Sequence, residues 1–194
     1  MPSFVQTVRE VLFNPVGFFR GIRRQGDYLN PLIFAIICSL ITAIIGGFLG
    51  LIISLISGEG IGSSIAGLFG NIIGIPIATT IGLFIGAGIY HLLVLLFVRP
   101  AHAGYEATFR AVAYAQAVQA VAFLAFIPIL GLLVILVIAV YQVVLNVIAI
   151  REMHATTTGR AVAVVLVPVA IVLLLGLLLV GTILAIFAAA MSQS

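Results

Sequence analysis

This chain has few titratable or ligand-binding side chains, and several of them lie inside long apolar stretches. Titratable groups in such a setting are costly to bury, so they are the first candidates for function. His91, with His102 and His154, could in principle hold a metal ion. Their spacing is wider than that of usual metal sites, so we predict no metal and interpret His91 as a hydrogen-bonded packing residue, with proton or substrate handling as the alternative.

Arg110 and Tyr114 lie one helical turn apart at the start of an uncharged stretch. An arginine there can extend its guanidinium to lipid phosphates, and a tyrosine favours the membrane interface. We therefore expect an interfacial pair.

Four amides occupy the same part of the chain at helical spacing, Gln116, Gln119, Gln142 and Asn146. Amide side chains hydrogen-bond across membrane helices. We interpret them as contacts between two neighbouring helices, and the lining of a pore or ligand pocket is the alternative.

Enzyme signatures are absent from the sequence. It has no His-Glu-x-x-His, no nucleophile elbow, no phosphate loop and no carboxylate pair within an apolar stretch. We predict a nonenzymatic protein without a cofactor.

The composition indicates the class of protein that carries these residues. The chain has 194 residues, 64% hydrophobic and 7% charged, with mean hydropathy +1.41, whereas a soluble domain carries about 25% charged residues. The single cysteine, Cys38, excludes an intrachain disulfide. Eight basic residues scattered between apolar runs form no groove for nucleic acid. The sequence is that of an integral membrane protein.

Charged residues divide the chain into uncharged stretches of 31 (28–58), 39 (60–98), 40 (111–150) and 34 (161–194) residues. One helix needs about 20 residues to cross a bilayer. If the second stretch holds one span and the third holds two, all eight arginines share one side of the membrane and only Glu59 faces the other. Arginine favours the cytoplasmic side, so we predict a cytoplasmic N-terminus and an external C-terminus.

The predicted fold is an all-α membrane protein with five transmembrane helices over about 31–57, 72–98, 107–127, 129–150 and 161–190 (domain 31–194). Residues 60–71 are expected to be an interfacial or bent lead-in. Pro128 and Gly131 are expected to make the turn between the third and fourth spans, and Pro168 a modest kink in the last. The Gly-x-x-x-Gly patterns that begin at Gly46, Gly70 and Gly82 predict close packing within the chain.

Residues 1–30 are expected to form short amphipathic helices at the membrane interface. Ser3 and Gln6 have capping-box spacing, and Phe4, Val8, Val11 and Leu12 define an apolar face that we expect to lie on the membrane. Asn14-Pro15 starts a second helix that ends at Gly26. It carries Arg20, Arg23 and Arg24, which suit anionic headgroups. Asn30-Pro31 repeats the cap. A docking surface for a cytosolic partner is the alternative to a membrane anchor.

Several short patterns occur together in order along nearly the whole chain: Asn14-Pro15 with Phe18-Phe19, Asp27-Tyr28 before Pro31, His91-Leu92, Tyr105, Phe109-Arg110, Ala113-Tyr114, Ile127-Pro128 with Gly131, His154 and Arg160-Ala161. In this order and spacing the chain resembles the Yip domain family of five-span membrane proteins, named for binding Ypt/Rab GTPases, and above all its compact prokaryotic members.

The resemblance implies a cytoplasmic N-terminus, five helices and no catalytic activity. Eukaryotic relatives act in vesicle formation and in the organisation of the Golgi and endoplasmic reticulum. The chain lacks their long polar N-terminal region and the Asp-Leu-Tyr-Gly-Pro type segment, so GTPase binding is not carried over.

Three functions are compatible with these features. The first is a membrane scaffold or adaptor, with the bilayer, other membrane proteins or itself as partners. The second is a small permease or channel that uses the polar residues of spans two to four. The third is an accessory subunit of a larger membrane complex. The basic residues are all arginine, which favours the plasma membrane of a bacterium or archaeon.

Overall fold

The computed structural model describes residues 3–58, 60–98, 102–127 and 129–191, except the side chains of 188 and 189. Two short helices, α1 (Phe4–Phe13) and α2 (Pro15–Gly21), precede the long ones. The long elements are α3 (Leu29–Ile56), α4 (Ile61–Phe97), α5 (Tyr105–Ala115) continued by the 3₁₀ helix η1 (Gln116–Phe126), α6 (Gly131–Met153) and α7 (Thr158–Met191). Five helical segments are thus long and apolar enough to span a membrane. The predicted all-α fold class is confirmed.

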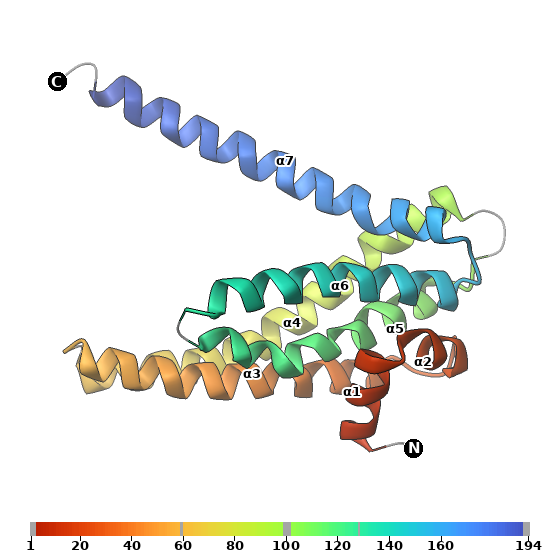
Figure 1. Ribbon diagram of the computed structural model, residues 1–194, viewed down its shortest axis with the longest axis horizontal. Coiled ribbons are helices and arrows are strands. Elements are labelled where there is room, and N and C mark those ends of the chain that lie inside the picture. Colours follow the sequence, from red (N-terminus) through yellow and green to blue (C-terminus); the bar gives the residue numbers. More distant parts are fainter. Residues whose placement is uncertain (1–2, 59, 99–101, 128, 192–194) are drawn as a thin grey trace.

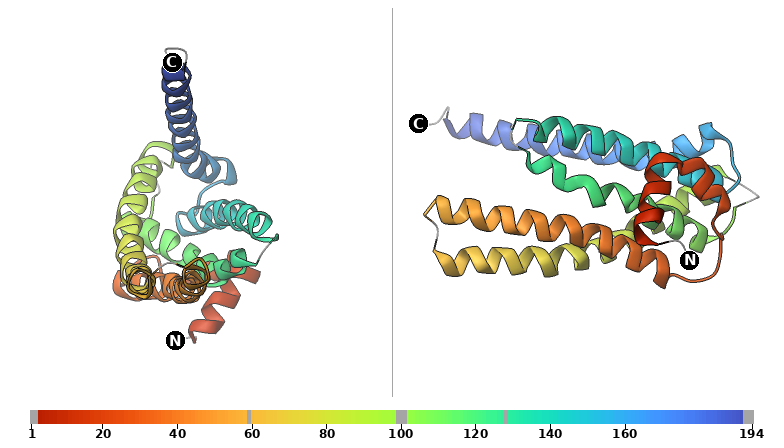
Figure 2. Two further views of the ribbon diagram at one scale, coloured as in Figure 1. Left: turned by 90° about the vertical axis from the view of Figure 1, so that its left-hand side faces the viewer. Right: turned by 60° about the horizontal axis from the view of Figure 1, so that its bottom comes forward.

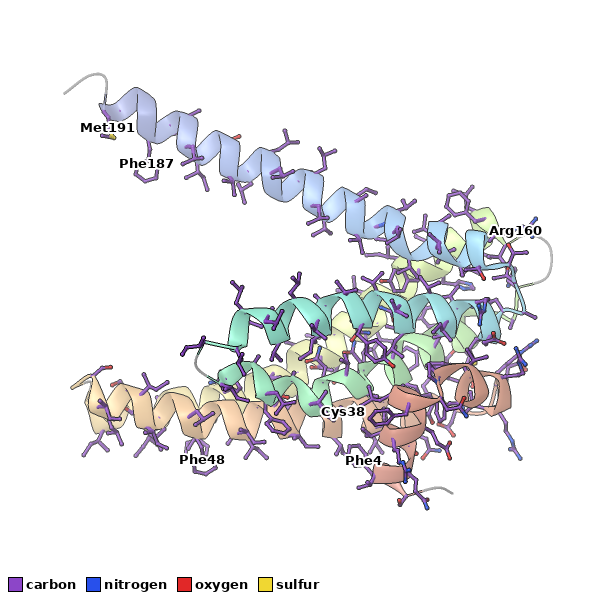
Figure 3. All side chains as sticks on the ribbon, in the orientation of Figure 1. Phe4, Cys38, Phe48, Arg160, Phe187 and Met191 are labelled. Carbon is purple, nitrogen blue, oxygen red and sulfur yellow. The ribbon has the colours of Figure 1, made fainter. Side chains whose placement is uncertain are left out.

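The bundle has two ends of different chemistry (Figure 1). The short helices, the α4–α5 connection and the α6–α7 connection lie at one end, which we call the polar end. The α3–α4 and η1–α6 connections lie at the other, the apolar end. Figure 3 shows Arg160 at the polar end, and Phe187 and Met191 at the far tip of α7. Arg99 and Glu59, two of the charged residues from which the topology was predicted, lie outside the described residues.

The hydrophobic core lies in the half of the bundle next to the polar end. Buried residues of α6 occur only from Leu145 onward and those of α3 only up to Gly47. The core also takes in Phe19 of α2 and Val11 of α1. Toward the apolar end the helices expose large aliphatic side chains, as lipid-facing helices do.

The start of α1 has the predicted capping box. The Ser3 hydroxyl accepts the Gln6 N–H at 3.3 Å, and the Gln6 side chain accepts the Ser3 N–H at 2.9 Å. The predicted apolar face of α1 packs on the bundle. Val11 is fully buried, and the Phe4 and Phe34 rings lie 5.4 Å apart.

The second short helix begins as predicted and ends earlier. The Asn14 side chain accepts the Gly17 N–H at 3.3 Å, and Pro15 follows in the first turn. The helix ends at Gly21, because Ile22 is extended and starts the crossing to α3. The prediction that this helix runs to Gly26 is therefore wrong.

The first long helix begins without the predicted asparagine cap. Asn30 lies inside α3, and Asp27 supplies the acceptors instead. Its carboxylate accepts the Asn30 backbone N–H at 2.8 Å and the Asn30 side-chain amide at 2.7 Å. These hydrogen bonds lower the pKa of Asp27, the larger part coming from the backbone N–H.

The glycine-rich residues expected to be a separate lead-in belong to α4, which is one continuous helix of 37 residues with Pro76 inside. At 1.5 Å per residue it is about 55 Å long, well beyond a hydrocarbon core of roughly 30 Å. We expect α4 to tilt in the bilayer or to extend beyond it.

The third span changes helix type at its middle. Residues 105–115 are α-helical, and 116–126 form a 3₁₀ helix. Runs of 3₁₀ longer than three or four residues are uncommon and mark strained or functional segments. Side chains from other helices bind carbonyls there: Gln142 Nε2 donates to the Ala115 carbonyl at 3.3 Å, and the Thr42 hydroxyl donates to that of Gln119.

The η1–α6 turn uses its residues differently from the prediction. Ile129 takes the left-handed conformation, with φ 70°, which is strained for a β-branched residue. Gly131 is needed for space, because a Cβ there would overlap the Ala125 carbonyl oxygen. Pro128 lies outside the described residues.

The predicted small-residue packing is present at one of the six motif glycines. A Cβ at Gly46 would lie 2.5 Å from Phe126 Cζ, whereas the other five have open space around them: Gly50, Gly70, Gly74, Gly82 and Gly86.

The last helix diverges from the bundle (Figures 1 and 2). Among the side chains of α7 that the structure describes, the buried ones, Ala161, Val164 and Val165, all precede Pro168. Proline removes a backbone hydrogen bond at this point.

Candidate functional site

A cleft of about 630 Å³ lies at the polar end, between the N-terminal helices and the bundle. We call it the Arg110 cleft. Its polar wall includes Arg23, Asp27 and Arg110, and its apolar wall includes Phe34 and Ile37 of α3. The cleft thus joins segments from the first thirty residues to α3 and α5.

The Arg110 guanidinium does not extend to the surface as expected, because the residue is only 7% exposed. Its Nη1 donates to the Asp27 carbonyl at 2.9 Å and lies 3.9 Å from Glu106 Oε1. Its Nε is buried without an acceptor. The carbon Cζ lies 6.0 Å from the centre of the Tyr114 ring, so Tyr114 contacts Arg110 over its face.

Glu106 forms an ion pair with Arg110 but no hydrogen bond to it. Its carboxylate Oε1 accepts the Gly26 N–H, and 3.9 Å is too long for a hydrogen bond to the guanidinium. Asp27 uses both carboxylate oxygens on Asn30. The charged residues that line the Arg110 cleft are two arginines, Arg23 and Arg110, and one aspartate, Asp27, so the lining keeps a net positive charge.

The three arginines near α2 have different surroundings. Arg20 Nε donates to Glu152 Oε2 at 3.1 Å, and so connects α2 to α6. Arg23 lines the Arg110 cleft. Arg24 is exposed and adds positive potential near His154.

A second polar group at the same end joins two of the histidines through Thr108. Thr108 Oγ1 lies 3.1 Å from His91 Nδ1 and 3.0 Å from His154 Nε2. The third histidine, His102, lies beside His91 with ring centres 5.8 Å apart. Within the described residues no group of three His, Cys, Asp or Glu side chains could hold a metal ion.

Backbone contacts determine which ring nitrogens carry protons. The Ala103 N–H donates to His154 Nδ1 at 3.1 Å, so the proton of the neutral His154 ring is on Nε2 and is donated to Thr108. The Thr108 hydroxyl can then donate to His91 Nδ1, with the Gly104 carbonyl at 3.5 Å as a weaker acceptor.

Burial lowers the pKa of His154 to about 4, with smaller contributions from repulsion by His91, His102 and Arg24. The residue is 1% exposed. A second proton would have to go to Nδ1, which already faces the Ala103 N–H. His154 is therefore neutral at physiological pH.

The four predicted amides line one cavity of about 290 Å³ within the membrane-spanning helices, the amide cavity. Gln116 and Gln119 come from η1, and Gln142 and Asn146 from α6. The Gln142 Oε1 and Asn146 Oδ1 atoms are buried without hydrogen-bond partners. Two such acceptors in a low-dielectric interior are costly, and they would accept hydrogen bonds from water or from a donor solute.

Some residues of these sites were not predicted as such. Thr108 carries no sequence signal, because its role depends on histidines from two other helices. Glu106 lies four residues before Arg110, a spacing typical of helical ion pairs, and could have been noticed. Asp27 appeared only as part of the family resemblance.

The fold is that of a multi-pass membrane protein, with five apolar helices and with polar groups at one end. Two short N-terminal helices pack against the bundle at that end. The Yip1 domain model matches residues 9–190. The chain therefore belongs to the Yip1 domain family, and the predicted resemblance is confirmed. That family is not known for enzymatic activity. No curated protein and no solved structure gives a significant match.

Proposed function

We propose that this chain is a nonenzymatic membrane scaffold or adaptor, with its polar end in the cytoplasm of a bacterium or archaeon, and that the outer face of α1 engages other membrane components. The observation that carries the proposal is the exposed face of α1. Phe13 is 82% exposed beside a depression of about 440 Å³ that Arg9 and Glu10 also line.

The inner face of α1 makes this surface rigid. A helix of ten residues is marginal alone in water, but here Val11 is buried and the Tyr141 hydroxyl donates to the Leu12 carbonyl. An exposed aromatic side chain that stands beside charged residues on a rigid helix is typical of a protein–protein contact.

Photo-crosslinking in native membranes tests the proposal. A photoreactive amino acid at Phe13 is expected to give protein adducts of defined mass, whereas one at Leu174, which faces outward on α7, gives lipid adducts. An adduct with a second copy of the chain indicates a self-assembling scaffold, and a stoichiometric partner indicates an accessory subunit. If Phe13 labels lipid alone, α1 is a membrane anchor and the scaffold surface is not there.

The orientation has its own test. In a Cys38→Ala background, we expect Gln25→Cys to react with an impermeant maleimide only after permeabilisation, and Gly60→Cys to react in intact cells. The opposite pattern contradicts a cytoplasmic polar end.

A small permease or channel is the second candidate, and the amide cavity favours it. Unpartnered acceptors of Gln142 and Asn146 lie inside the membrane-spanning helices, as a hydrogen-bonding solute path requires. Purified protein in liposomes is expected to conduct water or a small neutral solute, and Asn146→Leu to abolish the flux. Flux equal to that of empty liposomes removes this candidate.

A further inference from the structure

We infer that the Arg110 cleft binds one anionic phospholipid, with the phosphate against Arg110 and Arg23 and an acyl chain along Ile33 and Ile37. The inference does not depend on the scaffold function. It concerns a single bound lipid, in contrast to general attraction between arginines and headgroups.

The charges of the cleft favour an anion. Arg110 is more than nine-tenths buried, and a buried guanidinium is stable only when its charge is compensated and its donors are paired. Within the described residues its Nε lacks an acceptor, and its ion pair with Glu106, at 3.9 Å, includes no hydrogen bond. Arg23 adds a second guanidinium to the lining. Guanidinium groups bind phosphate oxygens through charge-assisted hydrogen bonds.

The opposite wall favours a ligand with a hydrocarbon part. Ile33 and Ile37 lie one turn apart on α3, are 44% and 37% exposed, and line the cleft. Phe34, on the same helix, is buried and also lines the cleft. An inorganic phosphate ion would leave this wall without a contact, whereas the glycerol and first methylenes of an acyl chain would cover it.

The position of the cleft favours a membrane lipid over a soluble ligand. It lies at the polar end, under α1, where the spans begin, so its polar wall stands at headgroup level and α3 leads into the hydrocarbon. Its volume of about 630 Å³ is in the usual range for ligand sites, roughly 300–1,000 Å³.

Native mass spectrometry of the full chain in a neutral detergent tests this. The probes are dioleoyl phosphatidylglycerol and dioleoyl phosphatidylcholine, which differ only in the headgroup. We expect one retained phosphatidylglycerol per chain, with about tenfold preference over phosphatidylcholine. Arg110→Gln is expected to bring this ratio close to one, and Arg23→Gln to reduce it in part.

Three controls test the source of the anion, the role of the apolar wall and the effect of surface charge elsewhere. Inorganic phosphate in excess is expected not to displace the lipid. Ile37→Asn is expected to weaken retention of both lipids while preserving their ratio. Arg9→Gln, on the outer face of α1, is expected to change neither.

Equal retention of the two lipids overturns the inference. So does a loss of preference in Arg9→Gln as large as that in Arg110→Gln, because the preference would then come from the overall positive charge and not from the cleft. Complete displacement by phosphate would identify a site for a small anion only. If Arg110→Gln does not purify as a folded protein, an unchanged ratio in Arg23→Gln and unchanged retention in Ile37→Asn contradict the inference.

Discussion

Arg20 and Glu152 are 132 positions apart in sequence, yet Arg20 Nε donates to Glu152 Oε2 at 3.1 Å. Glu152 also pairs with Arg151 at 2.7 Å. The pair holds α2 against the end of α6, and so fixes a helix whose Phe18 lines the Arg110 cleft. It is one of the contacts that turn a short N-terminal segment into part of the bundle.

Replacing Glu152 by glutamine is expected to loosen α2 without unfolding the bundle. The Arg20 side chain is 71% exposed, and such pairs contribute about 0.2–1 kcal/mol. Hydrogen exchange over residues 15–21 is therefore expected to rise several-fold, by up to about fivefold, while exchange over α3 is unchanged. Glu10→Gln, on the outer face of α1, is the control. If exchange in α2 does not change, the burial of Phe18 and Phe19 alone holds the helix.

Stability is expected to fall as the pH is lowered through the range of His154. Burial lowers its pKa in the folded state to about 4, below an unfolded value of about 6.5. Between these values the unfolded chain binds the proton and the folded chain does not, so stability is full above about pH 6.5 and is lost as the pH falls toward 4. The full loss is on the order of 3 kcal/mol.

Denaturation in mixed micelles at a series of pH values checks this expectation. His154→Gln is expected to be less stable at pH 7, because it loses the Thr108 and Ala103 contacts, but to show a flatter pH dependence. Glu10→Gln should keep the slope of the original chain. An equal slope in His154→Gln would show that other groups cause the pH dependence.

Leucine at Gly46 is expected to destabilise the protein, and leucine at Gly50 is not. A side chain at Gly46 meets the Phe126 ring at 2.5 Å, whereas Gly50 has nothing within 4 Å. Overpacking of this kind costs about 1–3 kcal/mol. Unfolding by sodium dodecyl sulfate measures both variants. A larger effect at Gly50 would mean that this face contacts another chain.

The two amides of α6 are expected to respond differently to leucine. Gln142 also has an unpartnered Oε1 but donates to the Ala115 carbonyl at 3.3 Å, so Gln142→Leu is expected to be less favourable than Asn146→Leu by about 0.6 kcal/mol. Asn146 Oδ1 is buried without a partner, so Asn146→Leu is expected to be neutral or stabilising. The same unfolding assay tests both. A marked loss in Asn146→Leu would show that a bound water or ligand satisfies this oxygen.

Much of the fold could be predicted because its signals are local or depend on composition. Five spans follow from the lengths of the uncharged stretches together with the placement of all arginines on one side of the membrane. The starts of α1 and α2 follow from Ser3 with Gln6 and from Asn14 with Pro15. Each cap requires residues no more than four positions apart, so neighbours in sequence suffice to predict it.

The candidate sites could be predicted only as separate residues. Helical spacing placed Gln116 beside Gln119 and Gln142 beside Asn146, but the 3₁₀ geometry of η1 left no sequence signal. The extended conformation of Ile22 and the cap from Asp27 also depend on the crossing that leads from α2 to α3. Thr108 became a site residue only when α4 and α6 brought His91 and His154 to it.

Membrane insertion, the number of crossing helices and the distribution of charge could be read from the amino-acid sequence, because transfer from water to lipid depends on the content of each segment. The packing of the α1 apolar face on the bundle and the burial of Arg110 depend on tertiary contacts. Those contacts join residues that are far apart in sequence, such as Leu12 and Tyr141. They form only where the packed surfaces of the helices are complementary.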